Sequence, residues 1–242
     1  MTLKIKYLDG KKGSLKNNAI ILAKESKISD FKGIFDDNIN QKIINFLKNN
    51  KKTKDNKIFS LNLDFDRKLI IILLVKKNDF FQSEKIGAKF YDYVKSNEVN
   101  DLLILGSNFP SVIHNIKFDS FLHGAELKSY EFNLYKSKKK NKDINFNIWN
   151  KKNANNQQIK KKLNALLNGV NFTKDLVSEP GNILHPDEYA KRLVKLKKYG
   201  LKVNVYDEKK LKKLGCNALV GVGQGSIRGS YLVTIEWRGS KS

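Results

Sequence analysis

Several residue types are scarce in this chain of 242 residues, and each shortage excludes a class of protein. A single cysteine, Cys216, cannot form an internal disulfide, so a disulfide-stapled secreted domain is excluded and a reducing compartment is favoured. No run approaches the roughly 18 apolar residues that cross a bilayer, and the opening residues, MTLKIKYLDGKKG, lack the apolar segment of a secretory signal. We therefore expect a soluble, cytoplasmic protein without a membrane partner.

Acidic residues are also scarce, at 24 against 47 lysines and arginines, which gives a formal net charge of +23. Taken alone, this charge favours an anionic partner such as nucleic acid. Only four of the basic residues are arginine, however, and proteins that read bases favour the planar arginine fork. We interpret the charge as compositional drift, with nonspecific nucleic-acid binding as its consequence, while a dedicated nucleic-acid surface stays open as the alternative.

Apolar residues make up 40% of the chain, which is enough for a real core, and residues 1–150 alternate between strand and helix patterns. We expect strands at 4–8 and 19–24 as an opening pair joined through the turn-prone residues 9–13, and further strands at 58–64, 69–75, 101–105 and 144–148. We expect helices capped by Asp36 or Asp37 and by Ser83, and a third helix over 118–135. This order predicts an α/β sandwich with a mixed, largely parallel sheet, in which 69–75 is central and buried on both faces.

Residues 151–242 begin with a long helix that ends near Val177, before the break at Pro180 and Gly181. Pro186 is placed to be the first residue of the next helix, with Asp187 and Glu188 at its positive end. Beyond it we expect a strand at 202–206, a helix capped by Asp207 and closed by Gly215, and two strands at 218–222 and 231–237.

Three glycines, Gly221, Gly223 and Gly225, do not fit a dinucleotide loop, because G-x-G-x-x-G would need a glycine where Ser226 stands. We predict instead a tight connection between the strands at 218–222 and 231–237. Ser226 lacks the G-x-S-x-G elbow of a nucleophile, and Cys216 is expected to be a small core residue before a buried strand.

Metal ligands are not apparent in the sequence either. His114, His123 and His185 are too far apart for two ligands on one helix face, and no cysteine pair completes a zinc set. We expect these histidines at the surface or partly buried. After Glu188 the acidic residues at 207, 208 and 236 are too few and too separated for a two-metal site, and helix capping explains the first two.

Residues 171–186 read NFTKDLVSEPGNILHP, and their order resembles a segment of the leucyl aminopeptidases, Ala-Arg-Asp-Leu-Val-Asn-x-Pro-Ala-Asn-x-Leu-x-Pro. Asp175, Leu176, Val177, Pro180, Asn182, Leu184 and Pro186 match this segment. Ser178, Gly181 and His185 depart from it. Two further stretches are similar to the family: residues 121–136, before a lysine-rich loop at 137–143, and residues 219–226, where the family has a Val-Gly-Gln-Gly-Ser turn.

The resemblance implies an N-terminal α/β domain over residues 1–150, macro-like in the family. Residues 151–242 would then be a linker helix and the first part of an incomplete metallopeptidase catalytic domain. The complete enzymes remove N-terminal amino acids from peptides with two divalent ions, typically zinc, manganese or magnesium, and assemble as homo-hexamers. Their metal-binding motifs lie downstream of the segment matched by residues 231–237.

We therefore expect this chain to contain no catalytic, cofactor-binding or metal-binding residues, to bind no metal and to be inactive alone. One alternative is a basic, non-enzymatic module from a truncated gene that associates with DNA or serves assembly. Another is a split enzyme, in which a partner supplies the metal-binding half.

Overall fold

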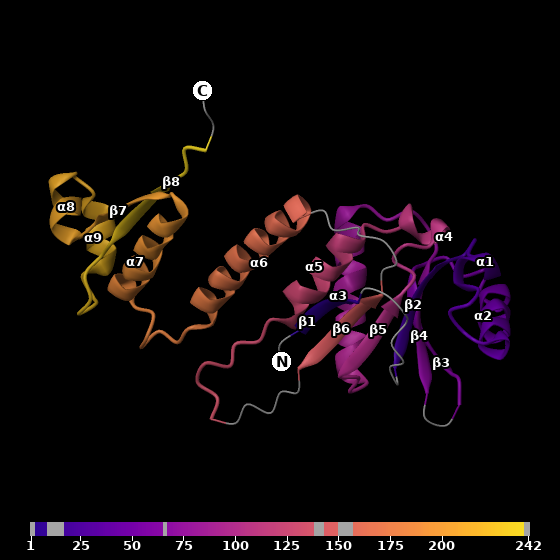
Figure 1. Cartoon of the computed structure of the whole chain (residues 1–242). Helices are drawn as coiled ribbons and strands as arrows, with labels where there is room; N and C mark the ends of the chain where they lie inside the picture. Colours follow the sequence, from indigo (N-terminus) through magenta and orange to yellow (C-terminus); the bar gives the residue numbers. More distant parts are fainter. Residues whose placement is uncertain (1–2, 9–16, 65–66, 138–142, 150–156, 240–242) are drawn as a thin grey trace. The chain divides into compact units, whose positions relative to one another are not determined.

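The computed structural model describes residues 3–8, 17–64, 67–137, 143–149 and 157–239. The chain forms two compact units, Met1–Asn171 and Phe172–Ser242 (Figure 1). Within the described ranges, no helix is long and apolar enough to cross a membrane. The turn predicted at residues 9–13, the start of the long helix before residue 157 and most of the lysine-rich loop lie outside the described residues. The domain boundary expected between residues 150 and 151 stays a prediction.

The first unit is built on a six-stranded sheet with the order β1-β6-β5-β2-β4-β3. Its strands are β1 (Leu3–Leu8), β2 (Asn18–Ala23), β3 (Lys57–Asn62), β4 (Lys68–Leu74), β5 (Asp101–Leu105) and β6 (Ile144–Trp149). All neighbouring strands are parallel except the antiparallel pair of β3 and β4. The α/β class with a mixed, largely parallel sheet is therefore confirmed.

The expected opening pair of strands is wrong, although both of its segments are strands. β1 pairs with β6 at the edge of the sheet, whereas β2 lies between β5 and β4. The physical reason is burial. β2 is buried at every residue and needs a partner on each side, while β1 alternates exposed lysines with half-buried apolar residues.

β4 is buried on both faces as predicted, since residues 69–74 are at most 3% exposed. The middle of the sheet, however, belongs to β5 and β2. Different helices cover the two faces of the sheet. Two neighbouring residues of the edge strand β3 show this, because they face different helices. Phe59 packs against Phe46 of α2 with 4.9 Å between ring centroids, while its neighbour Ile58 turns to the side of α3.

The helices described before Glu179 are α1 (Ile28–Phe31), α2 (Asp37–Asn49), α3 (Phe80–Ser96), α4 (Pro110–Ile113), α5 (Phe118–Ser129) and α6 (Gln157–Ser178), the last of which continues past Asn171 into the second unit. Asp36 caps α2 as predicted, because its Oδ1 accepts a hydrogen bond from the backbone N–H of Ile39 at 2.8 Å. The predicted end of α5 at residue 135 is wrong. Tyr130 leaves the helical region, and the Ser129 hydroxyl bonds the carbonyl of Glu126 within the last turn.

Ser83 does not cap α3, contrary to the prediction. Asp79 is the cap: its Oδ1 accepts from the backbone N–H of Gln82 at 2.7 Å, and Gln82 reciprocates in a capping box. Ser83 lies one turn further along, where its hydroxyl donates to the Asp79 carbonyl at 2.7 Å and accepts from the N–H of Lys117. A serine hydroxyl can bond the carbonyl four residues earlier, so the sequence signal for a cap was ambiguous.

α3 and α5 approach each other closely at two glycines. A Cβ on Gly87 would lie 1.8 Å from the Phe121 carbonyl oxygen, and one on Gly124 would lie 2.0 Å from the Glu84 carbonyl oxygen. Phe90 of α3 is 5.5 Å from Phe121, centroid to centroid. The lack of a side chain at both glycines is therefore what allows the two helices to pack together.

The second unit contains α7 (Pro186–Val194), the 3₁₀ helix η1 (Lys195–Tyr199), β7 (Lys202–Tyr206), α8 (Glu208–Lys213), α9 (Asn217–Gly223) and β8 (Leu232–Glu236). β7 and β8 form an antiparallel pair. The strands expected at 202–206 and 231–237 are confirmed, and so is the cap on α8, where the Asp207 carboxylate accepts from the backbone N–H of Lys210 at 2.9 Å.

The strand predicted at residues 218–222 is wrong, because these residues lie in α9. A short apolar run cannot distinguish a strand from a helix by periodicity. Here only Val220 of the run is buried, as expected of one helical turn facing a core. The expected connection between two strands is therefore wrong as well: Gly221 and Gly223 belong to the helix, and the following turn leads from α9 to β8.

We predict that Gly124→Ala destabilises the first unit by about 1 to 3 kcal/mol, because the added methyl group forces α5 away from the backbone of α3. Gly169→Ala in α6 is the matched control, since a Cβ there meets nothing within 4 Å. The control should be neutral or more stable by up to about 1 kcal/mol, because alanine favours a helix. Urea unfolding followed by circular dichroism measures both. Equal stability of Gly124→Ala and the wild type would show that the helices do not need this close approach.

Candidate functional site

The corner between α6 and α7 is where the sequence resemblance is strongest, and its backbone is fixed by local hydrogen bonds. The Pro180 carbonyl accepts from the N–H groups of Ile183 and Leu184, each at 2.9 Å. His185 is extended, with φ −89° and ψ 169°, as the residue before a proline prefers, and Pro186 is the first residue of α7 as predicted. The chain therefore turns within a few residues from one helix into the next.

Arg192 ties the two sides of this corner together. Its Nη1 donates to Oε1 of Glu179 at 2.7 Å, and its Nε donates to Oε1 of Glu188 at 3.1 Å. The side chain of Glu179 is only 2% exposed, whereas that of Glu188 is 32% exposed. The hydrogen bonds to Glu179, and then to Glu188, raise the pKa of Arg192. A buried carboxylate after α6 is thus held by a guanidinium on α7.

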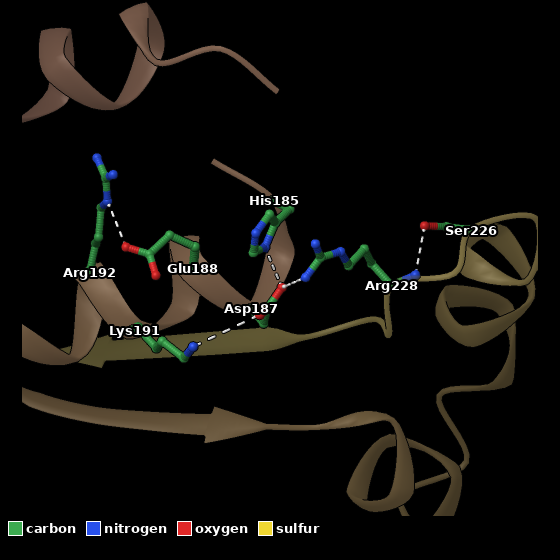
Figure 2. A network of polar contacts seen from close by, with 7 residues as sticks. All are labelled: His185, Asp187, Glu188, Lys191, Arg192, Ser226 and Arg228. Carbon is green, nitrogen blue, oxygen red and sulfur yellow. Dashed lines mark hydrogen bonds and ion pairs between the residues drawn. The ribbon is translucent and has the colours of Figure 1, made fainter. Parts of the chain in front are cut away.

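Asp187, in the first turn of α7, is a second centre of charge (Figure 2). One of its oxygens, Oδ1, is hydrogen-bonded to Nδ1 of His185 and lies 3.6 Å from Nη1 of Arg228, while Lys191 Nζ lies 3.9 Å from Oδ2. Partial desolvation opposes ionisation of this carboxyl. The hydrogen bonds from His185 and from its own backbone N–H outweigh it, and with the charge of Arg228 they hold the pKa below its ordinary value of 3.8.

Arg228 lies in the segment that follows α9, and Ser226 lies in the same turn. The Ser226 hydroxyl accepts from the backbone N–H of Arg228 at 3.0 Å. In Figure 2 the Arg228 side chain extends from that turn towards Asp187. The hydroxyl of Ser226 therefore stabilises a turn, and the guanidinium that this turn carries lies near Asp187.

Three other carboxylates of the second unit, Asp207, Glu208 and Glu236, have partners of their own. Asp207 caps α8, and Glu208 pairs with Lys212 at 2.8 Å one turn along that helix. Glu236 of β8 has a lowered pKa because of its hydrogen bond from Arg238 and the charge of Lys202. In the part of the chain that the structure describes, no three His, Cys, Asp or Glu side chains are grouped so that they could hold a metal ion. The described residues do not fit a metal centre.

The other candidate residues are scattered. His114 is exposed, and Cys216 is a half-buried free thiol that precedes α9 instead of a strand. His123 is only 3% exposed, which is deeper than its sequence suggested, and its Nδ1 lies 2.8 Å from Oε1 of Glu84. No sequence signal identified this pair, because Glu84 and His123 are 39 residues apart and lie on different helices.

Comparison with known proteins identifies relatives for both units. The cytosol aminopeptidase family, catalytic domain, matches residues 171–242. A probable cytosol aminopeptidase of Phytoplasma mali is 48% identical over 127 residues, which is 50% of this chain and 26% of that protein. A probable cytosol aminopeptidase of Nitrobacter winogradskyi is 35% identical over 172 residues, covering 69% of this chain and 34% of the relative. The chain thus spans about a third or less of the length of these curated relatives.

Two solved structures share the fold. A mutant of tomato leucine aminopeptidase aligns with 97% of this chain and 50% of its own length, with a TM-score of 0.69 and 16% identity. The bottromycin maturation enzyme BotP in complex with Mn aligns with 92% of this chain and 45% of its own length, with a TM-score of 0.61 and 17% identity. These comparisons give no support to the alternative of a DNA-associating module.

We predict that Arg192→Met lowers the free energy of unfolding by about 2 to 3 kcal/mol, because it removes the guanidinium that bonds the buried carboxylate of Glu179. Lys191→Met, at the neighbouring and largely exposed position, is the control and should change stability by less than about 0.5 kcal/mol. Urea unfolding of both variants measures the difference. Equal effects would show that the Arg192 contacts contribute nothing specific.

We also predict an acid-sensitive contact at Asp187. Because its folded-state pKa is lowered, its stabilising effect is complete above an unfolded-state pKa near 3.8 and is lost as the pH falls through the lower, folded-state value. A ¹³C NMR titration should show the Asp187 carboxyl ionising below 3.8, and His185→Ala should move its pKa upwards. A pKa that stays the same in His185→Ala would contradict this account of the hydrogen bond.

Proposed function

Because this chain belongs to the cytosol aminopeptidase family, we propose that it forms the N-terminal domain and the beginning of the catalytic domain of a leucyl aminopeptidase. Such an enzyme removes N-terminal amino acids from peptides. The observation that carries the proposal is the catalytic-domain match over residues 171–242. It begins at the residue before the second compact unit, Phe172–Ser242, which supports a separate catalytic part.

We place the N-terminal domain in residues 1–150 and assign α6 to the linker that leads into the catalytic part. The six-stranded sheet of the first unit has its own core, which supports an independent domain. Assembly as a hexamer and a cytoplasmic location remain proposals that rest on the family.

The proposed reaction is metal-dependent, and one structural neighbour is a complex with Mn. The described residues of this chain do not fit the metal. Glu179 and Glu188 are bonded to Arg192, Asp187 is bonded to His185, and no cluster of three candidate ligands exists among the described residues. We therefore assign the metal ligands of the complete enzyme to other residues and derive no step of hydrolysis through a metal here.

The contribution of this chain is structural. Arg192 fixes the corner between α6 and α7, and Arg228 connects the turn before β8 to the start of α7. The β7 and β8 pair leaves several large apolar side chains exposed, with Leu232 at 39%, Ile235 at 44% and Trp237 at 76%. These exposed side chains support the proposal that further polypeptide of a catalytic domain packs on this sheet.

An antibody against residues 1–150 tests the proposal in an extract of the native cell. We expect it to precipitate a species that releases leucine from a chromogenic amide and loses this activity when a chelator is added. A species of 27.8 kDa without any leucine-releasing activity would contradict the proposal. A precipitate made with an unrelated antibody is the control for contaminating peptidases.

A polypeptide of residues 1–242 alone should release no leucine from the same amide with added Mn²⁺, Zn²⁺ or Mg²⁺, because no three candidate ligands among its described residues are grouped so that they could hold a metal ion. A complete cytosol aminopeptidase assayed in parallel serves as the positive control. Metal-dependent release by the 242-residue polypeptide would overturn our assignment of the ligands to other residues.

A further inference from the structure

A groove of about 510 Å³ lies in the first unit, lined by residues of α3 and of the antiparallel strands β3 and β4. Its floor is apolar: Ile58 and Ile72 are directly paired across the two strands, and Ile86 comes from α3. This volume is within the range of small-molecule sites, roughly 300 to 1,000 Å³. The groove belongs to a different unit from the α6–α7 corner, and the proposed peptidase function does not use it.

Four lysines surround this floor. Lys57 begins β3 and Lys76 follows β4, while Lys85 and Lys89 are one turn apart on α3. Asp55 is the single carboxylate among the residues that line the groove. Bringing like charges together costs free energy, and this cost falls when a multivalent anion binds between them.

These lysines differ from others of the same unit in their contacts. Lys95 pairs with Glu131 at 2.6 Å, and Lys128 pairs with Asp92 at 3.0 Å. None of the four groove lysines forms an ion pair with a described residue. The Nζ atom of Lys85 lies over the Phe81 ring, 4.4 Å from its centroid. The ammonium groups are therefore available to a ligand.

The backbone at one end of the groove is held in place by amide side chains. Asn56 donates to Oδ1 of Asn78 at 2.7 Å and accepts from the N–H of Val75 at 2.8 Å. Asn78, which is 1% exposed, donates to the Asn115 carbonyl at 2.9 Å. These bonds connect the residues before β3, after β4 and after α4, so the rim that carries Lys57 and Lys76 is preorganised.

We propose that this groove binds a small organic molecule that carries two or more phosphates. Lysine ammonium groups act as compact point charges for phosphate, and four of them surround the floor of this groove. Ile58, the one partly exposed isoleucine of the three, offers apolar surface to the organic part of the ligand, with Ile72 and Ile86 buried beneath it. An inorganic phosphate alone would leave that floor unused.

Isothermal titration of the 242-residue chain at about 0.15 M salt tests this inference, with ATP and inorganic tripolyphosphate as the probes. We expect saturable one-to-one binding of ATP, tighter than that of tripolyphosphate because of the floor. Lys85→Gln combined with Lys89→Gln should weaken ATP binding about tenfold or more, as expected for the loss of charge-assisted contacts. Both lysines are exposed, so the fold should be kept, which circular dichroism verifies.

Lys6→Gln combined with Lys68→Gln is the matched control, since it removes the same charge from exposed positions outside the groove. It should leave ATP affinity within about twofold. Equal weakening in both double variants, or no saturable binding at this salt concentration, would mean adsorption by net charge only and would overturn the site. Tripolyphosphate binding as tightly as ATP would overturn the role given to the apolar floor.

Discussion

The first unit depends on burying strands that have apolar residues on both faces. β2 is buried at all six residues and β4 at six of seven. Such strands need a hydrogen-bonded neighbour on each side and a cover on each face. The structure meets both needs, because parallel neighbours flank β2 while α2 and α3 lie on opposite faces of the sheet. The alternation at Ile58 and Phe59 shows the two faces, and the remaining helices and edge strands are arranged around this requirement.

Local patterns predicted the elements of this unit better than their partners. The strands at residues 69–75 and 101–105 and the cap at Asp36 follow from apolar runs and capping chemistry within a few residues. The pairing of β1 with β6 could not be found in this way, since it joins segments about 140 residues apart. The contact of α3 with α5 could not be found from local patterns either. Gly87 and Gly124 are ordinary helical glycines in the sequence, and only the packed structure shows that each faces a carbonyl oxygen.

The second unit is stabilised in a different way, because it has few fully buried apolar residues. Leu176, Ala190, Val203, Leu211 and Val220 are each below 9% exposure. Charged side chains are paired with one another in the same unit. The sequence predicted that Pro186 starts a helix and that Asp187 belongs to its first turn, since both follow from helix termini. It did not predict Arg192 as the partner of Glu179 and Glu188, or Arg228 as the partner of Asp187. Long side chains can reach many acceptors, and spacing does not choose among them.

Charged side chains are therefore arranged differently in the two units: the carboxylates of the α6–α7 corner are paired, whereas the lysines of the groove form no ion pair with a described residue. At the α6–α7 corner each carboxylate faces a donor or a cation, so its charge is neutralised within the protein and little of it is left for a metal. In this segment the paired residues fix the backbone of the corner. In the groove beside α3, the lysines have no carboxylate to neutralise them among the described residues, apart from Asp55 on the same lining. The repulsion among these lysines falls when an anion binds between them. The carboxylates of the corner already have partners, so an added ion does not stabilise them in this way.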